Sequence, residues 1–274
     1  MKVGIIGGTG KMGRLFAAVF QRAGHEVMVS GRSTALSDTR LVVQCDLVIV
    51  SVPIRETVRV IDRIGPLMSE SQILCDLTSL KVGPVEAMLK SKARVIGLHP
   101  MFGPTVRTIK QQTIIMCPAR ADDVTVDTIL TIFTNEGAVC TITTPEDHDR
   151  MVAIVQGLTH FVTLCMAESV RKMGIDIAKT RAFTSPVYQI ELALAGRLLS
   201  QDPALYADIL QQNPYVPAVL DACIASVNDL REIVGSRDPG KFREFFDNNS
   251  RHFGTNCEEG MKMTDALIEC MVNR

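Results

Sequence analysis

The first half of the chain alternates short apolar segments with helical ones, and this order of elements constrains the fold most. Segments rich in Val, Ile and Leu occupy residues 2–7, 26–30, 47–52, 73–77 and 94–98. Helical patterns lie between several of them, at about residues 11–23, 54–64 and 81–90. Alternating strands and helices predict a parallel sheet with helices on both faces, because each crossover returns over one face. Two later strands are expected at residues 113–117 and 138–142, around a helix from about Asp123 to Glu136.

The pattern changes near residue 146. Thr144, Pro145 and the acids that follow are typical of the start of a helix. From there to Arg274 we find helical patterns only, broken at glycine and proline segments. We therefore predict an α/β domain over residues 1–145 and an all-helical domain over residues 146–274. A helical half with so many apolar residues needs a partner surface that covers its apolar faces. We therefore expect a homodimer.

The composition excludes several classes of protein. Among 274 residues, 29 Lys and Arg stand against 30 Asp and Glu, and no charge block indicates a nucleic-acid or membrane partner. We find no signal peptide and no apolar run as long as a transmembrane helix. The eight cysteines form no CxxC pair, which favours free thiols in the cytoplasm and no metal site.

A glycine motif follows the first strand and precedes the first helix. It reads Gly8-x-Gly10-x-x-Gly13. Gly8 would permit the tight turn, Gly10 the close approach of a pyrophosphate, and Gly13 the packing of helix on strand. The motif predicts a Rossmann-type dinucleotide-binding domain, although a glycine-rich turn without a ligand is the alternative. The expected contacts with the cofactor are Gly8, Thr9, Gly10, Lys11, Met12 and Gly13.

The end of the second strand bears on the choice of cofactor. An NAD site usually has an acid here for the ribose 2′-hydroxyl, but this chain has Arg32 and Ser33. An arginine suits a 2′-phosphate, so we expect NADP, with NAD as the alternative. Arg32 could equally be a solvated loop residue, and Asp38 could supply a late acid.

Polar segments follow the third and fourth strands at their carboxyl ends, where open α/β sheets bind ligands. Ser51, Val52 and Pro53 end the third strand and are further expected cofactor contacts. Thr78 and Ser79 follow the fourth strand and could bind a ligand or cap the next helix.

His99 follows the fifth strand and stands before Pro100. A histidine placed there can act as a general base near neutral pH, or can be a loop residue bonded to backbone. A second polar group lies on a nearly wholly apolar helix that we expect to be buried, where Gln156, Thr159, His160 and Thr163 recur at helical spacing and need a neighbouring helix or a ligand as partner. Arg197 interrupts a later apolar helix. If buried, it needs an anion, either a structural carboxylate such as Glu168 or Glu191 or a substrate carboxylate.

These segments together resemble the prephenate dehydrogenase family of the tyrosine pathway. The resemblance is carried by "SVPI", "DLTSLK", "GLHPMFGP", "EDHD", "VQGLTHF" and "SPVYQIELALAGRLLSQDPALYADI" and spans nearly the whole chain. It implies an oxidoreductase with a nucleotide-binding domain and an all-helical dimerisation domain. The implied reaction is the oxidative decarboxylation of prephenate to 4-hydroxyphenylpyruvate.

The resemblance also implies roles for single residues. His99 matches the catalytic base that takes the substrate 4-hydroxyl proton, and Ser79 matches the serine that supports this hydroxyl. Arg197 matches an arginine that binds a substrate carboxylate. His160, with Gln156 beside it, lines the substrate pocket, and His148 lies at the domain junction. Some relatives have a second arginine where this chain has Gln189, which leaves the second carboxylate contact open.

Three other functions compete with this hypothesis. Arogenate could replace prephenate as the substrate. Dehydrogenases of 3-hydroxy acids generally place a lysine in the first long helix of the second domain, where this chain has His160 and only a late Lys172. A regulator that senses NADP without chemistry need not keep His99, Ser79 and Arg197 together. With no segment before residue 1 to act as a mutase and few residues for a regulatory domain, we expect a single activity.

Overall fold

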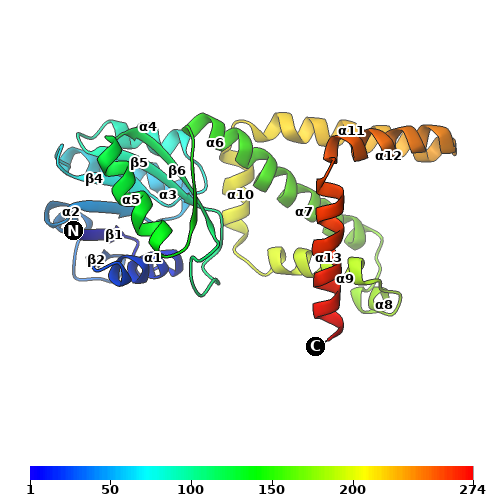
Figure 1. Ribbon diagram of the computed structural model, residues 1–274, viewed down its shortest axis with the longest axis horizontal. Coiled ribbons are helices and arrows are strands. Elements are labelled where there is room, and N and C mark those ends of the chain that lie inside the picture. Colours follow the sequence, from blue (N-terminus) through cyan, green and yellow to red (C-terminus); the bar gives the residue numbers. More distant parts are fainter. Residues whose placement is uncertain (274) are drawn as a thin grey trace. The chain divides into compact units, whose positions relative to one another are not determined.

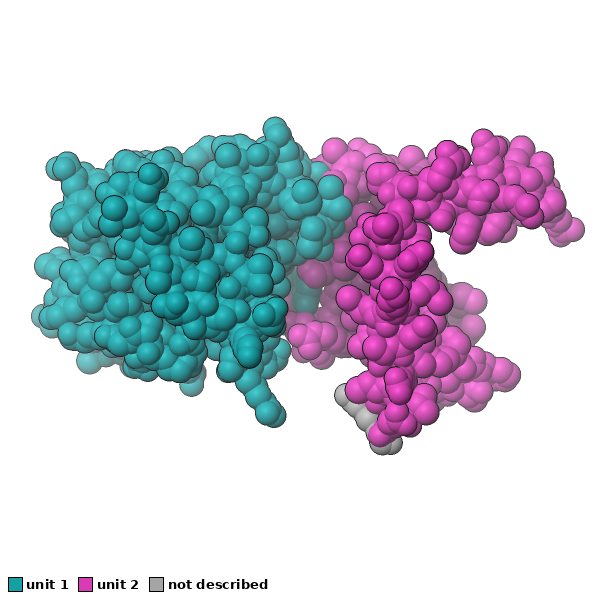
Figure 2. All heavy atoms as spheres, in the orientation of Figure 1, with its two compact units in different colours: residues 1–156, 204–216 teal, residues 157–203, 217–274 magenta. Residues whose placement is uncertain are grey.

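A computed structural model describes residues 1–273, which form two compact units (Figure 2). Unit 1 holds residues 1–156 and 204–216, and unit 2 holds residues 157–203 and the chain from residue 217 onward. Unit 1 therefore includes residues from both sides of the boundary expected near residue 146. The division into domains 1–145 and 146–274 stays a prediction.

Unit 1 is built on one sheet of seven strands, in the order β2-β1-β3-β4-β5-β6-β7. The strands are β1 (Lys2–Ile6), β2 (Glu26–Ser30), β3 (Leu47–Val50), β4 (Ile73–Asp76), β5 (Arg94–Pro100), β6 (Thr113–Arg120) and β7 (Val139–Ile142). All neighbouring pairs are parallel except β5 and β6. The predicted fold class, a Rossmann-type sheet followed by helices, is confirmed.

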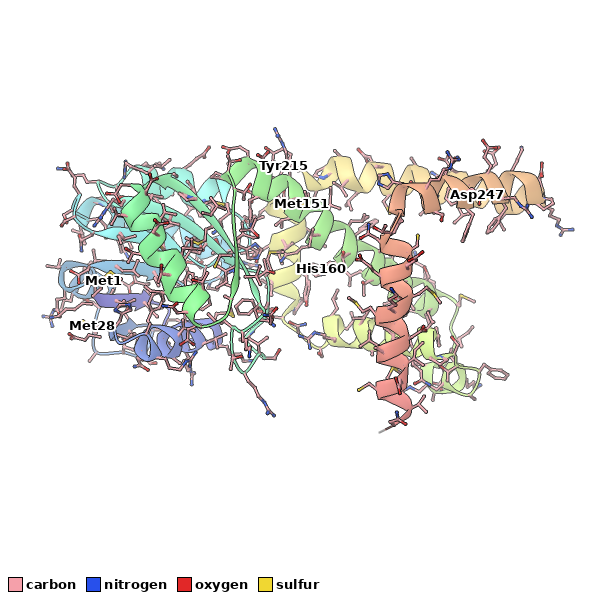
Figure 3. All side chains as sticks on the ribbon, viewed as in Figure 1. Met1, Met28, Met151, His160, Tyr215 and Asp247 are labelled. Carbon is pink, nitrogen blue, oxygen red and sulfur yellow. The ribbon has the colours of Figure 1, made fainter. Side chains whose placement is uncertain are left out.

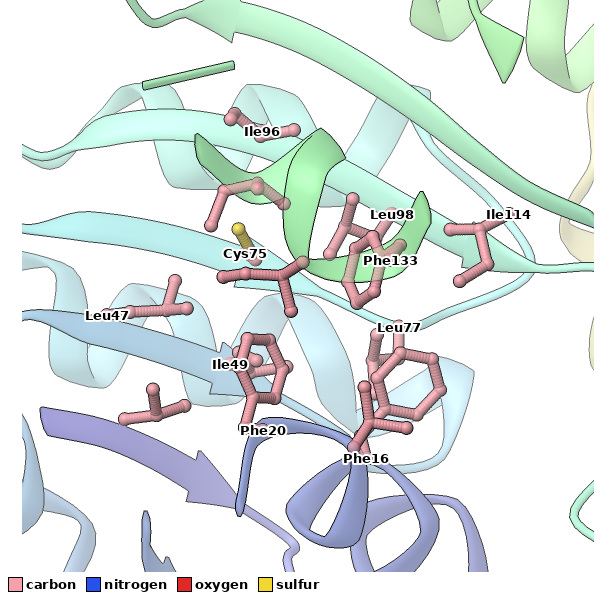
Figure 4. Packing of buried hydrophobic residues seen from close by; sticks show 14 of the residues in the cluster. Phe16, Phe20, Leu47, Ile49, Cys75, Leu77, Ile96, Leu98, Ile114 and Phe133 are labelled. Atoms are coloured by element: carbon pink, nitrogen blue, oxygen red, sulfur yellow. The ribbon is translucent and has the colours of Figure 1, made fainter. Parts of the chain in front are cut away.

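Helices cover both faces of this sheet (Figure 1). They are α1 (Lys11–Arg22), α2 (Asp38–Gln44), α3 (Ile54–Ile64), the short 3-10 helix Gly65–Leu67, α4 (Val82–Leu89) and α5 (Asp123–Asn135). On one face, Phe16 and Phe20 of α1 meet Phe133 of α5 edge-on over the strands (Figure 4). On the other face, α2, α3 and α4 bury a second cluster. Both faces of the central strands are therefore apolar, which explains their continuous runs of Val, Ile and Leu.

The reversal of β6 was not predicted. A parallel pair needs a crossover that traverses the sheet, usually as a helix, whereas residues 101–112 between β5 and β6 contain none. The chain therefore turns back, and β6 runs antiparallel to β5. The next unit, β6-α5-β7, is again parallel, as expected.

The helical half begins as the sequence predicts. Helix α6 (Pro145–Val152) starts with Thr144 as its N-cap, whose side chain accepts a hydrogen bond from the backbone N–H of Asp147. The helix continues through a π-helical segment, Ala153–Leu158, into α7 (Thr159–Lys172). The π-helix was not predicted, and it alters the assumed spacing of the polar residues from Gln156 onward.

After β7, helices follow one another to the end of the described chain, and no strand occurs among these residues. They are α8 (Ile177–Arg181), α9 (Pro186–Leu199), α10 (Pro203–Gln212), α11 (Val216–Ser236), α12 (Pro239–Phe253) and α13 (Asn256–Val272). Within unit 2, α7 packs against α9 and α12 against α13. Large apolar side chains on these helices and in the turn between α8 and α9 stay exposed, and Phe183 in that turn is 92% exposed. Unit 2 thus leaves much of its apolar surface uncovered in the single chain.

The helical run from Pro145 to Lys172 is long and apolar enough to cross a membrane, judged by length and composition alone. The expectation that no apolar run reaches this length is therefore wrong, because the charged residues of this run lie near its two ends and leave residues 151–167 without a charge. A helix that packs in a protein core meets the same criterion. His148, Asp149 and Val152 of this run are buried within unit 1.

Candidate active site

The glycine turn after β1 lies beside the end of β3, because β1 and β3 are neighbours in the sheet. Gly7, rather than the predicted Gly8, has the positive φ of the turn, +79°. A Cβ on Gly7 would lie 2.2 Å from the carbonyl oxygen of Ser51, and one on Gly8 would lie 2.6 Å from Val29. The turn therefore requires glycine at both positions, for backbone conformation and for packing respectively.

The start of α1 fits the pyrophosphate of a dinucleotide. A Cβ on Gly13 would lie 2.5 Å from the Gly7 carbonyl oxygen, so this glycine permits the close packing that the motif predicts. Gly10 is the N-cap, and within the described chain no side chain caps the helix and no acid lies in its first turn. Free N–H groups at a helix start bind anions. Thr9 and Met12 are half-buried beside them, and Lys11 is exposed.

The turn after β3 forms the other side of this crevice. Strand order changes direction between β1 and β3, and ligands bind at such a switch point. The N–H of Ser51 donates to the carbonyl of Ile6 over 2.8 Å, which fixes the two strand ends together. Val52 is half-buried and Pro53 is the N-cap of α3. The predicted cofactor contacts at residues 51–53 thus face the same end of the sheet as the glycine turn.

The end of β2 places Arg32 and Ser33 in an exposed turn, where Arg32 has no hydrogen bond or ion pair with any of residues 1–273. Asp38, the alternative acid, already has two partners. It accepts a hydrogen bond from Ser30 Oγ over 2.7 Å and pairs with the guanidinium of Arg63. The carboxylate of Asp38 is thus occupied by the protein, whereas the guanidinium of Arg32 is free.

His99 lies within β5, not in a loop after it. Residues 99 and 100 pair with Ile115 and Ile114 of β6, so the strand extends two residues beyond the predicted end. The antiparallel partner, which the sequence did not reveal, supplies this pairing. His99 is 2% exposed, and the sheet rather than a turn therefore fixes its backbone.

A chain of hydrogen bonds runs from His99 to a carboxylate on α6. His99 Nδ1 lies 2.8 Å from His148 Nε2, and His148 Nδ1 lies 2.7 Å from Asp149 Oδ1. All three side chains are buried within unit 1. Asp149 also accepts backbone N–H groups from Lys81, over 2.8 Å at Oδ1, and from Val82, over 3.0 Å at Oδ2.

These contacts determine which nitrogen of His99 carries the proton. Both oxygens of Asp149 accept backbone N–H groups, so the carboxylate is an acceptor and His148 Nδ1 must carry hydrogen. In neutral His148, Nε2 is then an acceptor, and His99 Nδ1 must be the donor. His99 Nε2 is therefore left with a lone pair. A histidine in this tautomer can accept a proton from a substrate.

Gln156 contacts the free nitrogen of His99. Its Nε2 lies 3.4 Å from His99 Nε2, and its Oε1 is buried with no partner among the described residues. An amide N–H directed at a lone pair matches the tautomer derived above. Gln156 lies in the π-helical segment, and such segments often occur at functional sites.

Burial and neighbouring charge hold His99 neutral. Desolvation lowers the pKa of His99 well below its usual value, and the nearby His148 and Lys81 lower it further. Desolvation also lowers the pKa of His148, while its hydrogen bond to Asp149 works in the opposite direction. Both rings are therefore neutral at pH 7, as a base and its support must be.

Comparisons with known proteins agree on one family. The model for the "Prephenate dehydrogenase, nucleotide-binding domain" matches residues 17–142, and the model for the "Prephenate dehydrogenase, dimerization domain" matches residues 144–248. The chain belongs to the prephenate dehydrogenase family.

Curated relatives support this membership. A protein of Methanocaldococcus jannaschii, described as a probable arogenate/prephenate dehydrogenase, is 32% identical over 98% of this chain. The T-protein of Haemophilus influenzae is also 32% identical over 98% of this chain. The chain spans 64% of the length of the first relative and 71% of the second.

Solved structures share the fold of this family member. The prephenate dehydrogenase of Aquifex aeolicus, in complex with hydroxyphenyl propionate and NAD+, matches with a TM-score of 0.74 and 20% identity, over 92% of this chain and 97% of that one. The arogenate dehydrogenase of Synechocystis matches with a TM-score of 0.72 and 18% identity, over 92% of this chain and 99% of that one.

The structure brings some of the family's expected site residues together and corrects others. His99 contacts both His148 and Gln156 in unit 1, and Ser79 is half-buried after β4. Neither Thr78 nor Ser79 caps α4. Thr78 instead donates to the Leu80 carbonyl and to Asp76, and the cap is supplied by Asp149.

The expected residues of unit 2 lie on α7 and α9. His160 is half-buried on α7 (Figure 3), and desolvation lowers its pKa. The polar residues were expected on a buried helix, but no residue of α7 is buried. Arg197 is exposed on α9, so the expectation of a buried arginine is wrong. Glu168 pairs with Arg171 and Lys172 instead. Arg197 pairs with no described carboxylate.

Asp149 is the functional residue that the sequence reasoning missed. It stands in the "EDHD" segment, where the sequence alone indicates no more than an acid near a helix start. The available signal was its position next to a histidine of a conspicuous motif. Among residues 1–273, no group of three His, Cys, Asp or Glu forms a metal site.

Replacing Asp149 with asparagine tests its double role. The asparagine of Asp149→Asn has one oxygen to accept the three N–H groups that the carboxylate binds, from Lys81, Val82 and His148. We therefore expect the substitution to lower the free energy of unfolding by about 1–3 kcal/mol. The same change frees His148 to adopt the other tautomer and should reduce turnover. Denaturant unfolding and steady-state kinetics measure the two effects.

The matched control is Asp147→Asn, two residues earlier on the same helix, where the side chain is 63% exposed. It should leave turnover unchanged and alter stability by less than about 0.5 kcal/mol. Equal effects of the two substitutions on stability and turnover would show that Asp149 does not have this double role.

Proposed function

We propose that this protein is a prephenate dehydrogenase, which oxidises and decarboxylates prephenate to 4-hydroxyphenylpyruvate. The observation that carries the proposal is the buried, neutral His99, whose Nε2 is left as the free acceptor by His148 and Asp149. A base of this kind suits the removal of a hydroxyl proton at neutral pH.

In the proposed reaction His99 takes the proton of the substrate 4-hydroxyl at Nε2. A bound nicotinamide cofactor supplies the acceptor for the hydride that leaves C4. The resulting ring ketone accepts the electron pair freed as carbon dioxide leaves C1, and the phenolate takes the proton back from His99. His148 orients the ring of His99 throughout, and Asp149 holds His148 in the tautomer that this requires. The Gln156 amide must give way to the substrate hydroxyl at Nε2.

The remaining roles come from family resemblance. Ser79 would support the same hydroxyl, Arg197 would bind a substrate carboxylate, and His160 would line the substrate pocket. The exposure of Arg197 supports a ligand role, because its charge is not neutralised by a described carboxylate. Gln189 is uncharged and cannot supply the second ionic contact.

Arogenate is the second candidate substrate. The Methanocaldococcus relative is described by both substrates, and the Synechocystis neighbour is an arogenate dehydrogenase. The two substrates differ in a keto or an amino group on the side chain, away from the hydroxyl that His99 contacts. The proton transfer to His99 would be the same for both.

Reduced cofactor should appear when the protein is mixed with NADP and prephenate. His99→Asn should slow turnover by about 10²–10⁴-fold, because the general base is lost, while cofactor affinity stays unchanged. Absorbance of the reduced cofactor, measured for both substrates with both cofactors, tests the function. No reduction in any of the four combinations, or near wild-type turnover of His99→Asn, would contradict it.

The free guanidinium of Arg32 supports NADP as the cofactor, with Ser33 beside it in the same turn. The occupation of Asp38 by Ser30 and Arg63 argues against this acid as the ligand of an unphosphorylated ribose. Relatives differ in this respect, since the Aquifex structure contains NAD+ and a Schizosaccharomyces pombe relative is named for NADP+.

Arg32→Ala should raise KM for NADP about 10- to 100-fold, because a charge-assisted contact with the 2′-phosphate is lost. KM for NAD should change little. Arg40 is also exposed but lies on α2, and Arg40→Ala is the matched control. It should change neither KM for NADP nor KM for NAD. An equal rise in KM for both cofactors would show that Arg32 does not recognise the 2′-phosphate of NADP.

We also propose that unit 2 pairs with a second copy of the chain. The exposed apolar residues on α11, α12 and α13, among them Val227, Val234, Phe242 and Phe246, need a partner surface. The matching dimerization-domain model supports the same assembly.

Sedimentation should give twice the 30.0 kDa chain mass. The double substitution Phe242→Asp and Phe246→Asp should shift the protein to the monomer, because two charges would be buried at the interface. Asp229→Asn, on the exposed surface of α11, is the control. A monomeric wild-type protein at micromolar concentration would contradict the assembly.

A further inference from the structure

Lys81 is a buried cation that the proposed reaction does not use. Its side chain is 0% exposed, and its Nζ pairs with the equally buried Asp76 at the end of β4. The same Nζ donates to the carbonyl of Leu98 over 2.7 Å. Its backbone N–H donates to Asp149 over 2.8 Å. One residue thus holds the strand position before His99 and the carboxylate that orients His148.

The sheet makes room for this lysine. A Cβ on Gly97, two residues before His99 on the same face of β5, would lie 3.1 Å from Lys81 Cδ and 2.8 Å from Val85. Glycine in a strand often marks such a close approach. The stem of Lys81 therefore passes across β5 where any other residue than glycine would displace it.

Stability does not explain a buried lysine here. Removing an ion pair from water costs several kcal/mol, and apolar residues of similar volume are often as stable or more stable. The Asp76 carboxylate is also incompletely satisfied, since its Oδ1 has no partner in the described chain. A costly, incompletely satisfied pair that bonds to the residue before a candidate base indicates a functional role.

We propose that Lys81 is the positioning residue of the general base, which holds His99 in place through Leu98 and opposes a second positive charge beside it. This inference rests on the proposed function for its role in turnover, but its effect on the charge of His99 does not. Lys81 touches neither substrate nor cofactor in this account, and acts through His99 and Asp149.

The groups around His99 come from each element packed against it. The uncharged Gln156 comes from the π-helical segment, and His99 pairs with the apolar Ile115 of β6. Cys117 of β6 pairs with Gly97, and burial raises the pKa of its thiol to about 12, so that it is neutral. Loss of the lysine charge would leave the imidazolium opposed by desolvation and His148 only. The pKa of His99 would rise toward its usual value. The ionisable groups that act on His99 are Lys81 before α4 and His148 of α6, and Asp149 of α6 and Asp76 of β4 act in turn on His148.

The test is Lys81→Met, which keeps the length of the stem and removes the charge. We expect the acidic limb of the kcat/KM profile to move up by about one pH unit, since a nearby like charge shifts a pKa by about that much or more. NMR titration of ring-labelled His99, without substrate, should show the same shift. Lys90→Met, an exposed lysine at the end of α4, should change neither.

The double variant Asp76→Asn with Lys81→Met serves if the single variant does not fold, because it leaves no unpaired buried carboxylate. It should still show the higher pKa of His99. An unchanged His99 pKa in a folded variant, with turnover reduced or not, would overturn the proposal. A shifted pKa in a protein without activity toward prephenate would uphold the effect on His99 and reject the proposed function instead.

Discussion

The carboxylate of Asp149 is the acceptor on which the site depends. It caps α4 through the N–H groups of Lys81 and Val82, and it holds His148 Nδ1. A further contact holds α6, because the Asn213 amide donates to the Asp149 backbone carbonyl over 2.8 Å. The carboxylate therefore joins α6 to the start of α4, and through His148 it sets the tautomer of both histidines.

His99 is suited to act as a base because its surroundings keep its ring neutral and leave Nε2 free to accept a proton. Burial costs the imidazolium its hydration, and the histidine and lysine nearby disfavour a further charge. Such a base accepts a proton only when the developing negative charge of a substrate is also present. The contact of Gln156 over 3.4 Å is long for a hydrogen bond, so a substrate hydroxyl displaces it at little cost.

Local sequence patterns predicted the elements whose cause is local. The strands, the glycine turn and the Thr144 cap follow from periodicity and from the conformational needs of single residues. The reversal of β6 depends on a connection without a helix, and the π-helix depends on contacts made after folding. The role of Asp149 was hidden for the same reason, since its partners lie 67 and 68 residues away in the chain. His99 was identified by position and family resemblance, while its tautomer required the geometry.

The most direct measurement is the tautomer of His99 in the free protein. Long-range ¹H–¹⁵N spectra of ring-labelled histidine distinguish hydrogen on Nδ1, on Nε2 or on both. We expect a neutral ring at pH 7 with hydrogen on Nδ1 and a lone pair on Nε2. A ring protonated at both nitrogens, or with its hydrogen on Nε2, would contradict the assignment of His99 as the base.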